Sequence, residues 1–204
     1  MADSLRNPWT TLRSTPQYEN PWIRVTEHDV LNPSGKPGIY GVVHFKTTAI
    51  GVVPVHDDGS TVLVGQYRYP LRAYSWEIPE GGGDPAVSPQ HSAERELLEE
   101  TGLMAAHWLE MAAVDLSNSV TDERAVCFVA WSLTEGIAAP EETEELQLRR
   151  LPLVDALQMA KRGEIRDAVS VLSLLRLEGL AQEGALPAAL LHRLKAGGLA
   201  VEAS

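Results

Sequence analysis

The sequence predicts an α/β (α+β) fold in which a mixed β-sheet is sandwiched between helices. Two β-branched runs, 48–55 and 61–67, are apolar without alternation, which is typical of strands covered on both faces. A helix with clear start and stop signals is expected at 89–101, and two amphipathic helices are expected at 153–162 and 167–177. These helices would cover the two faces of the sheet.

The composition is that of one well-packed domain with an additional arm. The chain has 204 residues, 44% of them hydrophobic, which is enough for one substantial core but not for two large domains. The formal net charge of −11 argues against a general affinity for nucleic acid or anionic membranes, because few basic side chains are available to displace counterions. We therefore expect a small-molecule ligand, and a polyanionic one would need a local cation.

The single cysteine, Cys127, excludes an intramolecular disulfide and fits a reducing cytosol, so a cytoplasmic location is expected. It lies in the apolar run 125–130, which predicts a buried thiol on a strand rather than a nucleophile. The chain has no apolar run of 18 residues and no secretory leader at Met1, so neither a membrane span nor secretion is expected. The six histidines do not cluster at ligand spacing, which argues against zinc.

Residues 1–46 are expected to form an N-terminal extension. The first 20 residues are polar and contain two prolines, so they are predicted to pack loosely. The segments 22–30 and 39–45 alternate between apolar and polar residues and flank a turn rich in Asn, Pro and Gly. This pattern predicts an antiparallel hairpin.

The main domain is expected at 47–178. Its first two apolar runs are joined by residues 56–60, with Gly59 at the permissive position, which predicts a second hairpin. Two later strands, 108–116 and 124–133, are separated by a polar loop. The segment 179–204 is rich in Ala, Leu and Gly, with a helix start at Pro187, and is predicted to be a helical tail that is frayed or packs in a dimer.

The stretch 81–103 joins a glycine-rich loop to a short acidic helix. Three consecutive glycines allow the backbone to approach a ligand closely, and Gly81 and Gly82 are the candidates for substrate contact. Ser88 offers an N-cap oxygen to a helix that begins with a proline, and Gly102 is a natural left-handed stop. These signals set the helix limits.

Three carboxylates share one face of this helix. At about 100° per residue, Glu96, Glu99 and Glu100 point the same way, while Leu97 and Leu98 point toward a core. Like charges at this spacing cost a few tenths of a kcal/mol per pair, and anions in the last turn oppose the helix dipole. Binding of Mg²⁺ or Mn²⁺ would turn this repulsion into coordination, whereas the alternative is a solvated acidic face.

The complete spacing resembles the Nudix box. Residues 95–103 read RELLEETGL, and Gly81 lies fourteen residues before Arg95, as in the signature of hydrolases that cleave nucleoside diphosphates linked to another group. One position departs, because Val87 stands where the family has a glutamate that helps to hold the box arginine and the loop. The departure bears on how Arg95 is oriented and on whether activity is full.

The resemblance implies the Nudix fold and metal-assisted hydrolysis with Mg²⁺ or Mn²⁺. Glu96 and Glu100 are the first candidates for direct metal ligands, and Glu99 is the next. Glu99 and the other box glutamates are also candidates for the general base that takes a proton from water. Glu80 directly precedes the box glycine, where the family offers a main-chain carbonyl oxygen to a metal. Arg95 would orient the neighbouring carboxylates rather than touch the substrate.

The flanking segments resemble the ADP-ribose pyrophosphatase and nucleotide-sugar hydrolase branch of this family. Residues 66–70 and 76–81 are similar to the sequence that leads into the box there. Arg68 could hold a phosphate, although an ion pair at a strand end is equally open. In this branch the loop matching 117–123 carries a glutamate that activates water or binds a metal.

Glu123 is the first candidate for that glutamate and Asp122 the second, with a solvated loop acid as the alternative. The N-terminal sheet of the branch helps to form a dimer and the nucleoside pocket, so a homodimer is expected. Trp22 could stack on the base, although a core tryptophan is the safer interpretation.

The resulting hypothesis is metal-dependent hydrolysis of ADP-ribose or an NDP-sugar to a nucleoside monophosphate and a sugar phosphate. One alternative is hydrolysis of another nucleotide, such as a dinucleoside polyphosphate. A second alternative is a catalytically weak Nudix-fold protein that binds a nucleotide sugar and reports on it. Val87 keeps this second alternative open, whereas the intact segment 95–103 weighs against it.

Overall fold

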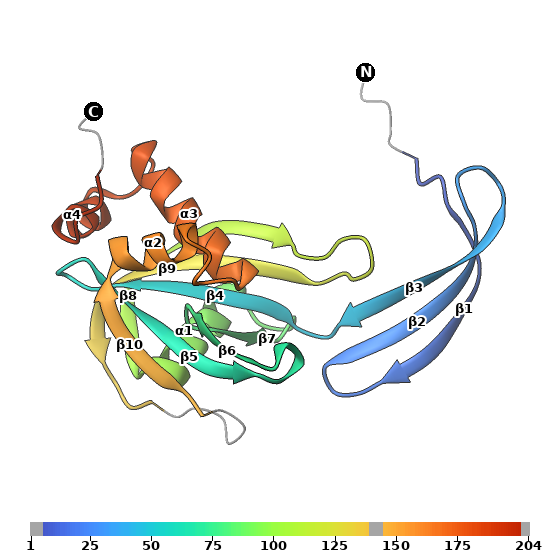
Figure 1. Cartoon of the computed structure of the whole chain (residues 1–204), viewed down its shortest axis with the longest axis horizontal. Coiled ribbons are helices and arrows are strands. Elements are labelled where there is room, and N and C mark those ends of the chain that lie inside the picture. Colours follow the sequence, from blue (N-terminus) through green and yellow to red (C-terminus); the bar gives the residue numbers. More distant parts are fainter. Residues whose placement is uncertain (1–5, 139–144, 201–204) are drawn as a thin grey trace. The chain divides into compact units, whose positions relative to one another are not determined.

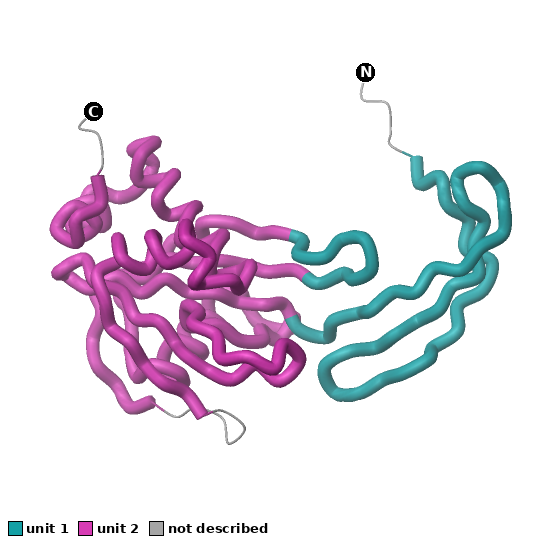
Figure 2. The backbone as a smooth tube through the Cα atoms, in the orientation of Figure 1, with its two compact units in different colours: residues 1–47, 115–123 teal, residues 48–114, 124–204 magenta. Residues whose placement is uncertain are grey.

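The computed structural model describes residues 6–138 and 145–200 (Figure 1). The chain divides into two compact units (Figure 2). Unit 1 comprises residues 1–47 and 115–123, and unit 2 comprises residues 48–114 and 124–204. The outer ends of the predicted extension and tail, 1–5 and 201–204, lie outside the described residues.

Unit 1 contains a three-stranded antiparallel sheet in the order β1–β2–β3. Its strands are Thr10–Glu19, Ile23–Leu31 and Pro37–Phe45. The predicted hairpin is confirmed as β2 and β3. The expectation that residues 1–20 pack loosely was wrong for residues 10–19, because β1 pairs with β2 along most of its length.

Strand β1 was not predicted because it is an exposed edge strand. All ten of its residues are exposed, so no alternation of burial marks it in the sequence. Its pairing shifts register twice, once beside Pro16, and an edge position with irregular pairing is where a proline is tolerated in a sheet.

Unit 2 contains two sheets. The first is ordered β7–β4–β9–β8, in which β4 and β9 are parallel, and the second is ordered β10–β5–β6 and is antiparallel. The strands of the first sheet are Glu80–Gly83, Thr48–Val55, Arg124–Glu135 and Leu103–Asp115. Those of the second are Gln147–Pro152, Ser60–Arg68 and Ala73–Glu77.

The predicted turn between β4 and β5 forms, but the predicted hairpin does not. The His56 N–H donates to the Ser60 carbonyl at 2.9 Å, and Gly59 takes a φ of +75°. The two strands then enter different sheets, because β7 and β9 occupy the two edges of β4. The hairpin prediction was therefore wrong in its strand pairing.

Helices α1 (Pro89–Thr101) and α3 (Ala168–Gln182) cover opposite faces of β4. Ile50 packs in the core cluster with Leu97 of α1. A Cβ on the neighbouring Gly51 would lie 2.5 Å from Val169 Cγ1 of α3, so this residue faces the other helix. Alternate residues of a strand face opposite sides, and the prediction of a mixed sheet between helices is confirmed.

The C-terminal helices pack on unit 2. Helix α2 (Leu153–Lys161) contacts β10 and β5, and α4 (Ala188–Ala196) follows Pro187. Leu190 and Leu194 of α4 are fully buried, so the option of a frayed tail was wrong for this helix, while packing of the tail in a dimer stays a prediction. Helix α3 also continues across the predicted boundary at residue 178. In the part of the chain that the structure describes, none of the helices has the length and apolarity that a membrane span requires.

Candidate active site

Helix α1 is fixed by the caps that the sequence predicted. Ser88 Oγ accepts a hydrogen bond from the His91 N–H at 3.2 Å. Gly102, with a φ of +70°, ends the helix and donates its N–H to the Leu98 carbonyl at 2.9 Å. Leu97 is fully buried and sets the rotation of the helix about its axis. Glu96 and Glu100 are thereby turned toward β7.

The two glutamates meet the first residues of β7. The Glu96 carboxylate lies so close to Gly81 that an added Cβ would be 2.3 Å from Glu96 Cδ, so only glycine allows this approach. Glu100 Oε2 accepts the N–H of Glu80 at 3.0 Å. Both glutamates are buried, with 7% and 4% of their surface exposed. These buried oxygen donors have the chemistry that suits a hard divalent cation.

Arg95 holds the acidic face in place. Its Nη1 donates to Glu99 Oε2 at 2.6 Å, and its Nη2 donates to the Gly82 carbonyl at 3.0 Å and to Glu96. The side chain thus ties two box carboxylates to the glycine-rich strand. Val87, where the family has a glutamate, is exposed and on the loop before the helix, so Arg95 is oriented here through other groups.

A second acidic group surrounds Arg68 at the end of β5. Arg68 Nε donates to both carboxylate oxygens of Glu77 at 3.0 Å, and its Nη2 donates to Glu80 Oε1 at 2.7 Å. Of the two interpretations left open by the sequence, the ion pair at a strand end is the one observed. Glu77 is almost completely buried, so this pair is held firmly.

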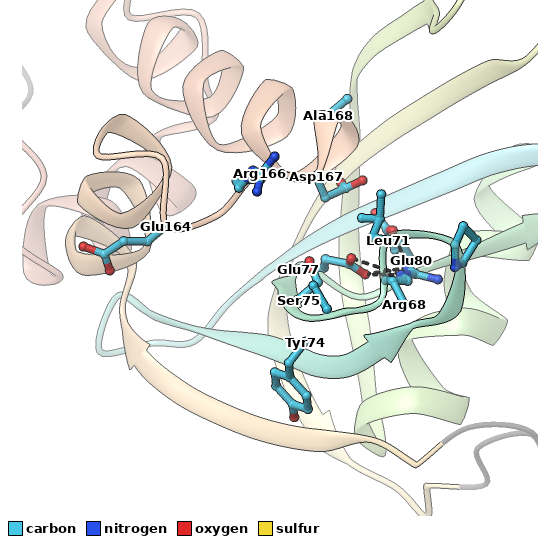
Figure 3. A pocket seen from close by; sticks show the side chains of 12 residues that line it. Arg68, Leu71, Tyr74, Ser75, Glu77, Glu80, Glu164, Arg166, Asp167 and Ala168 are labelled. Carbon is cyan, nitrogen blue, oxygen red and sulfur yellow. Dashed lines mark hydrogen bonds and ion pairs between the residues drawn. The ribbon is translucent and has the colours of Figure 1, made fainter.

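Asp167 completes this group from the start of α3. Its Oδ2 accepts the Ser170 N–H at 2.7 Å, which makes it the N-cap of the helix. One carboxylate oxygen from each of Glu77, Glu80 and Asp167 lies within 4.8 Å of the others (Figure 3). Burial, reinforced by the Asp167 and Glu77 carboxylates, raises the pKa of Glu80 well above its ordinary value.

These residues line a pocket of about 530 Å³ between the β5–β6 connection and the start of α3 (Figure 3). Sequence reasoning gave no role to Glu77 or Asp167, although both lie in segments that it singled out. Asp167 carries a local N-cap signal, but no local signal places it beside Glu80, because their contact depends on how α3 packs.

The remaining candidates lie in unit 1. Asp122 pairs with His44 Nδ1 at 2.9 Å and accepts the Phe45 N–H at 2.9 Å, which gives it a structural role in that unit. Glu123 follows it and is half-buried. Trp22 is 68% exposed beside the bend between β1 and β2, so its interpretation as a core residue was wrong. The catalytic role of Glu123 and base stacking on Trp22 stay predictions.

Comparison with known proteins identifies the family. Residues 45–173 match the model of the NUDIX domain. The chain belongs to the Nudix family. In this Nudix protein, residues 9–43 also match the nucleoside diphosphate sugar hydrolase N-terminal domain.

Two curated relatives of this Nudix protein are named ADP-ribose pyrophosphatase. The protein from Mycobacterium tuberculosis is 31% identical over 150 residues, covering 72% of this chain and 71% of the relative. The protein from Bacillus subtilis is 32% identical over 152 residues, covering 74% of this chain and 82% of the relative. A crystal structure of an ADP compounds hydrolase superposes with a TM-score of 0.77 at 23% identity, covering 87% of this chain and 97% of that one, so the two share a fold.

Proposed function

We propose that this Nudix protein hydrolyses the pyrophosphate bond of ADP-ribose or an NDP-sugar, giving a nucleoside monophosphate and a sugar phosphate. The observation that carries the proposal is the convergence of two buried box carboxylates, Glu96 and Glu100, on the start of β7. The substrate class is supported by the two relatives named ADP-ribose pyrophosphatase and by the match of residues 9–43.

We assign Glu96 and Glu100 as direct ligands of Mg²⁺ or Mn²⁺, with Glu99 and the Glu80 main-chain carbonyl as further donors. A cation bound there supplies positive charge to the diphosphate oxygens and makes a water molecule easier to deprotonate. Arg95 holds Glu96 and Glu99 in position through the bonds described above. The carboxylates are therefore organised by the protein itself.

The other site assignments extend this proposal. Glu123 is our candidate base for the attacking water, and Glu99 is the alternative. The Gly81 and Gly82 backbone would approach the diphosphate closely, because glycine leaves space there. Arg68 would contact the part of the substrate that enters the adjoining pocket, and Trp22, which is exposed, would stack on the base.

We also propose a homodimer formed through unit 1 and a cytoplasmic location. The sheet of unit 1 exposes several large apolar side chains, among them Leu12, Tyr18 and Ile39, which suits a surface that another copy covers. The free thiol of Cys127 fits a reducing compartment. Light scattering after size-exclusion chromatography tests the dimer, and a monomer at micromolar concentration would contradict it.

The decisive experiment is a nucleotide panel with the purified full chain. ADP-ribose, ADP-glucose, UDP-glucose and a dinucleoside polyphosphate are incubated with Mg²⁺, with Mn²⁺ and with EDTA, and the products are resolved by chromatography. We expect AMP and ribose 5-phosphate from ADP-ribose, with no release in EDTA. Faster hydrolysis of the dinucleoside polyphosphate would favour the alternative substrate. No turnover together with ligand-induced thermal stabilisation would favour the binding protein.

Two matched variants test the metal ligands. Glu100→Gln removes the charge of a buried carboxylate while keeping its size, so most of the rate should be lost. Glu110→Gln is the control, because Glu110 is an exposed carboxylate on β8, and its rate should equal that of the wild type. A Glu100→Gln enzyme that retains the wild-type rate would overturn the ligand assignment.

A further inference from the structure

The loop that carries Glu123 is part of the N-terminal unit. Residues 115–123 connect β8 to β9 of unit 2, yet they cluster with residues 1–47 in unit 1 (Figure 2). The proposed base Glu123 therefore belongs to unit 1, whereas the proposed metal ligands on α1 belong to unit 2. The contacts that fix this loop within unit 1 are expected to fix the proposed base as well.

Burial does not hold the loop in place. Within residues 115–123 no side chain is buried, and residues 117–120 are exposed. A segment without buried apolar contacts opens easily unless hydrogen bonds hold it. The Thr121 N–H and hydroxyl both donate to the Ser117 carbonyl at 3.0 Å, and the Glu123 N–H donates to Thr121 Oγ1 at 3.3 Å. These bonds shape the turn but do not attach it to a strand.

Strand β3 supplies the attachment. Val43 pairs with Thr121 in a parallel bridge. The Val43 N–H donates to the Val120 carbonyl at 2.9 Å, and the Asp122 N–H donates to the Val43 carbonyl at 3.3 Å. The loop therefore lies along the edge of β3 that is not paired with β2.

The Asp122 side chain fastens the end of the loop next to Glu123. One of its carboxylate oxygens lies 2.9 Å from His44 Nδ1, and the other accepts the Phe45 N–H at 2.9 Å. Two contacts to neighbouring residues of β3 fix the orientation of the carboxylate, and hydrogen bonds to a charged group are the stronger kind. Because consecutive Cα atoms are about 3.8 Å apart, a shift of the Asp122 main chain is passed on to Glu123.

We propose that Asp122, with His44 as its partner, is the positioning residue for Glu123. The inference deepens the proposed function and rests on it for the assignment of Glu123 as the base. The proton passes from the attacking water to the Glu123 carboxylate, and Asp122 takes no part in that transfer. Asp122 instead holds the loop in the conformation from which Glu123 accepts the proton.

The first test is the steady-state rate with ADP-ribose and Mg²⁺. Asp122→Ala removes both side-chain contacts to β3, so kcat should fall between about tenfold and a hundredfold while KM stays within about twofold. Asp122→Asn keeps an acceptor for the Phe45 N–H and a polar partner for His44, so it should retain most of the rate. Asn118→Ala changes an exposed side chain of the same loop and is the matched control, with the kcat of the wild type.

A double-mutant cycle tests whether Asp122 acts through Glu123. Glu123→Gln should lower kcat about a hundredfold, as expected for the loss of a general base. In that background Asp122→Ala should change kcat by less than about twofold, because the group that it positions no longer accepts a proton. A merely structural role of Asp122 would lower kcat by the same factor in both backgrounds. That result, or a Glu123→Gln enzyme with the kcat of the wild type, would overturn the proposal.

Hydrogen exchange tests the attachment of the loop without the reaction. In Asp122→Ala the main-chain amides of residues 116–123 should exchange about tenfold faster, as expected for the loss of hydrogen bonds, while those of α1 keep their wild-type protection. Unchanged exchange in the loop would overturn the proposal. If Asp122→Ala fails to fold by circular dichroism, His44→Ala, which removes one of the two contacts, takes its place in both tests.

Failure of this inference differs from failure of the proposed function. Hydrolysis by the wild type together with an unchanged kcat in Asp122→Ala would refute the positioning role and keep the proposed function. A wild type that hydrolyses neither ADP-ribose nor an NDP-sugar would refute the proposed function. The exchange measurement would then still decide whether Asp122 fixes the loop.

Discussion

Gly81→Ala should lower activity about a hundredfold while leaving the fold intact. An added Cβ at this position would lie 2.3 Å from Glu96 Cδ and 2.3 and 2.4 Å from its carboxylate oxygens, whereas ordinary contact begins at 3.4 Å. The carboxylate must therefore retreat by about 1 Å, which is roughly the difference between these distances. The atoms that must move are the end of a flexible side chain, so the cost to folding is small.

The displacement falls on a proposed metal ligand. A misplacement of about 1 Å at a reacting centre lowers the rate about a hundredfold, or about 2.7 kcal/mol of transition-state stabilisation. We expect kcat/KM for ADP-ribose with Mg²⁺ to fall by about this factor, while the Tm shifts by less than about 4 °C.

The matched control for this prediction is Gly41→Ala. Gly41 lies in strand β3, and a Cβ there would meet nothing within 4 Å, so this variant should keep its activity and Tm. Steady-state kinetics and differential scanning fluorimetry on both variants provide the comparison. If Gly81→Ala kept kcat/KM within about threefold of the wild type, the placement of Glu96 over a glycine would not matter to the reaction, and our reasoning would be refuted.

Three further predictions concern stability. Ser88→Ala removes the acceptor of the His91 N–H and should lower the free energy of unfolding by about 1 kcal/mol in urea titrations. An unchanged free energy of unfolding would mean that this N-cap does not stabilise the helix. Leu194→Ala leaves a cavity under α4 and should cost about 2–5 kcal/mol by the same method, whereas a loss below about 0.5 kcal/mol would mean that the helix is not packed as described. Hydrogen bonds from the Ser60 side chain and main chain, with Arg150 nearby, lower the pKa of Asp58 to about 2. The unfolded chain binds more protons, so this stabilisation is complete above about pH 5 and is lost as the pH falls toward 2. The stability difference between wild type and Asp58→Asn should therefore shrink over that range, and a constant difference would contradict the assignment.

Local signals predicted the helices well and strand partners poorly. Ser88 and Gly102 fixed the ends of α1 because a cap depends on neighbours within one helical turn. The pairing of β4 depends instead on β7 and β9, which lie far along the chain, and no feature of the turn at 56–60 reports it. The turn at 56–60 was therefore predicted correctly, but the pairing of β4 with β5 was not, because the two strands lie in different sheets.

In the candidate site, too, residues brought together by local spacing were predicted and residues brought together by tertiary packing were not. Glu96, Glu99 and Glu100 were predicted together because helical spacing alone brings them to one face. Asp167 meets Glu80 only because α3 packs on β4, which is a tertiary event. The prediction for Trp22 gave more weight to its hydrophobicity than to its place in the bend, where its main-chain N–H donates to Asn20 Oδ1 at 2.9 Å. Composition does not reveal that such a residue stays exposed.

The parallel pairing of β4 and β9 has a consequence for synthesis of the chain. The pairs run from Ala49 with Ala125 to Val55 with Trp131, so the whole Nudix box is translated between two strands that are neighbours in the sheet. Closing so long a connection is slow compared with winding a helix. A nascent polypeptide still on the ribosome can thus contain every box residue before β9, one of the two inner strands of its sheet, has been made. Such a chain is expected to be inactive until Trp131 has left the exit tunnel.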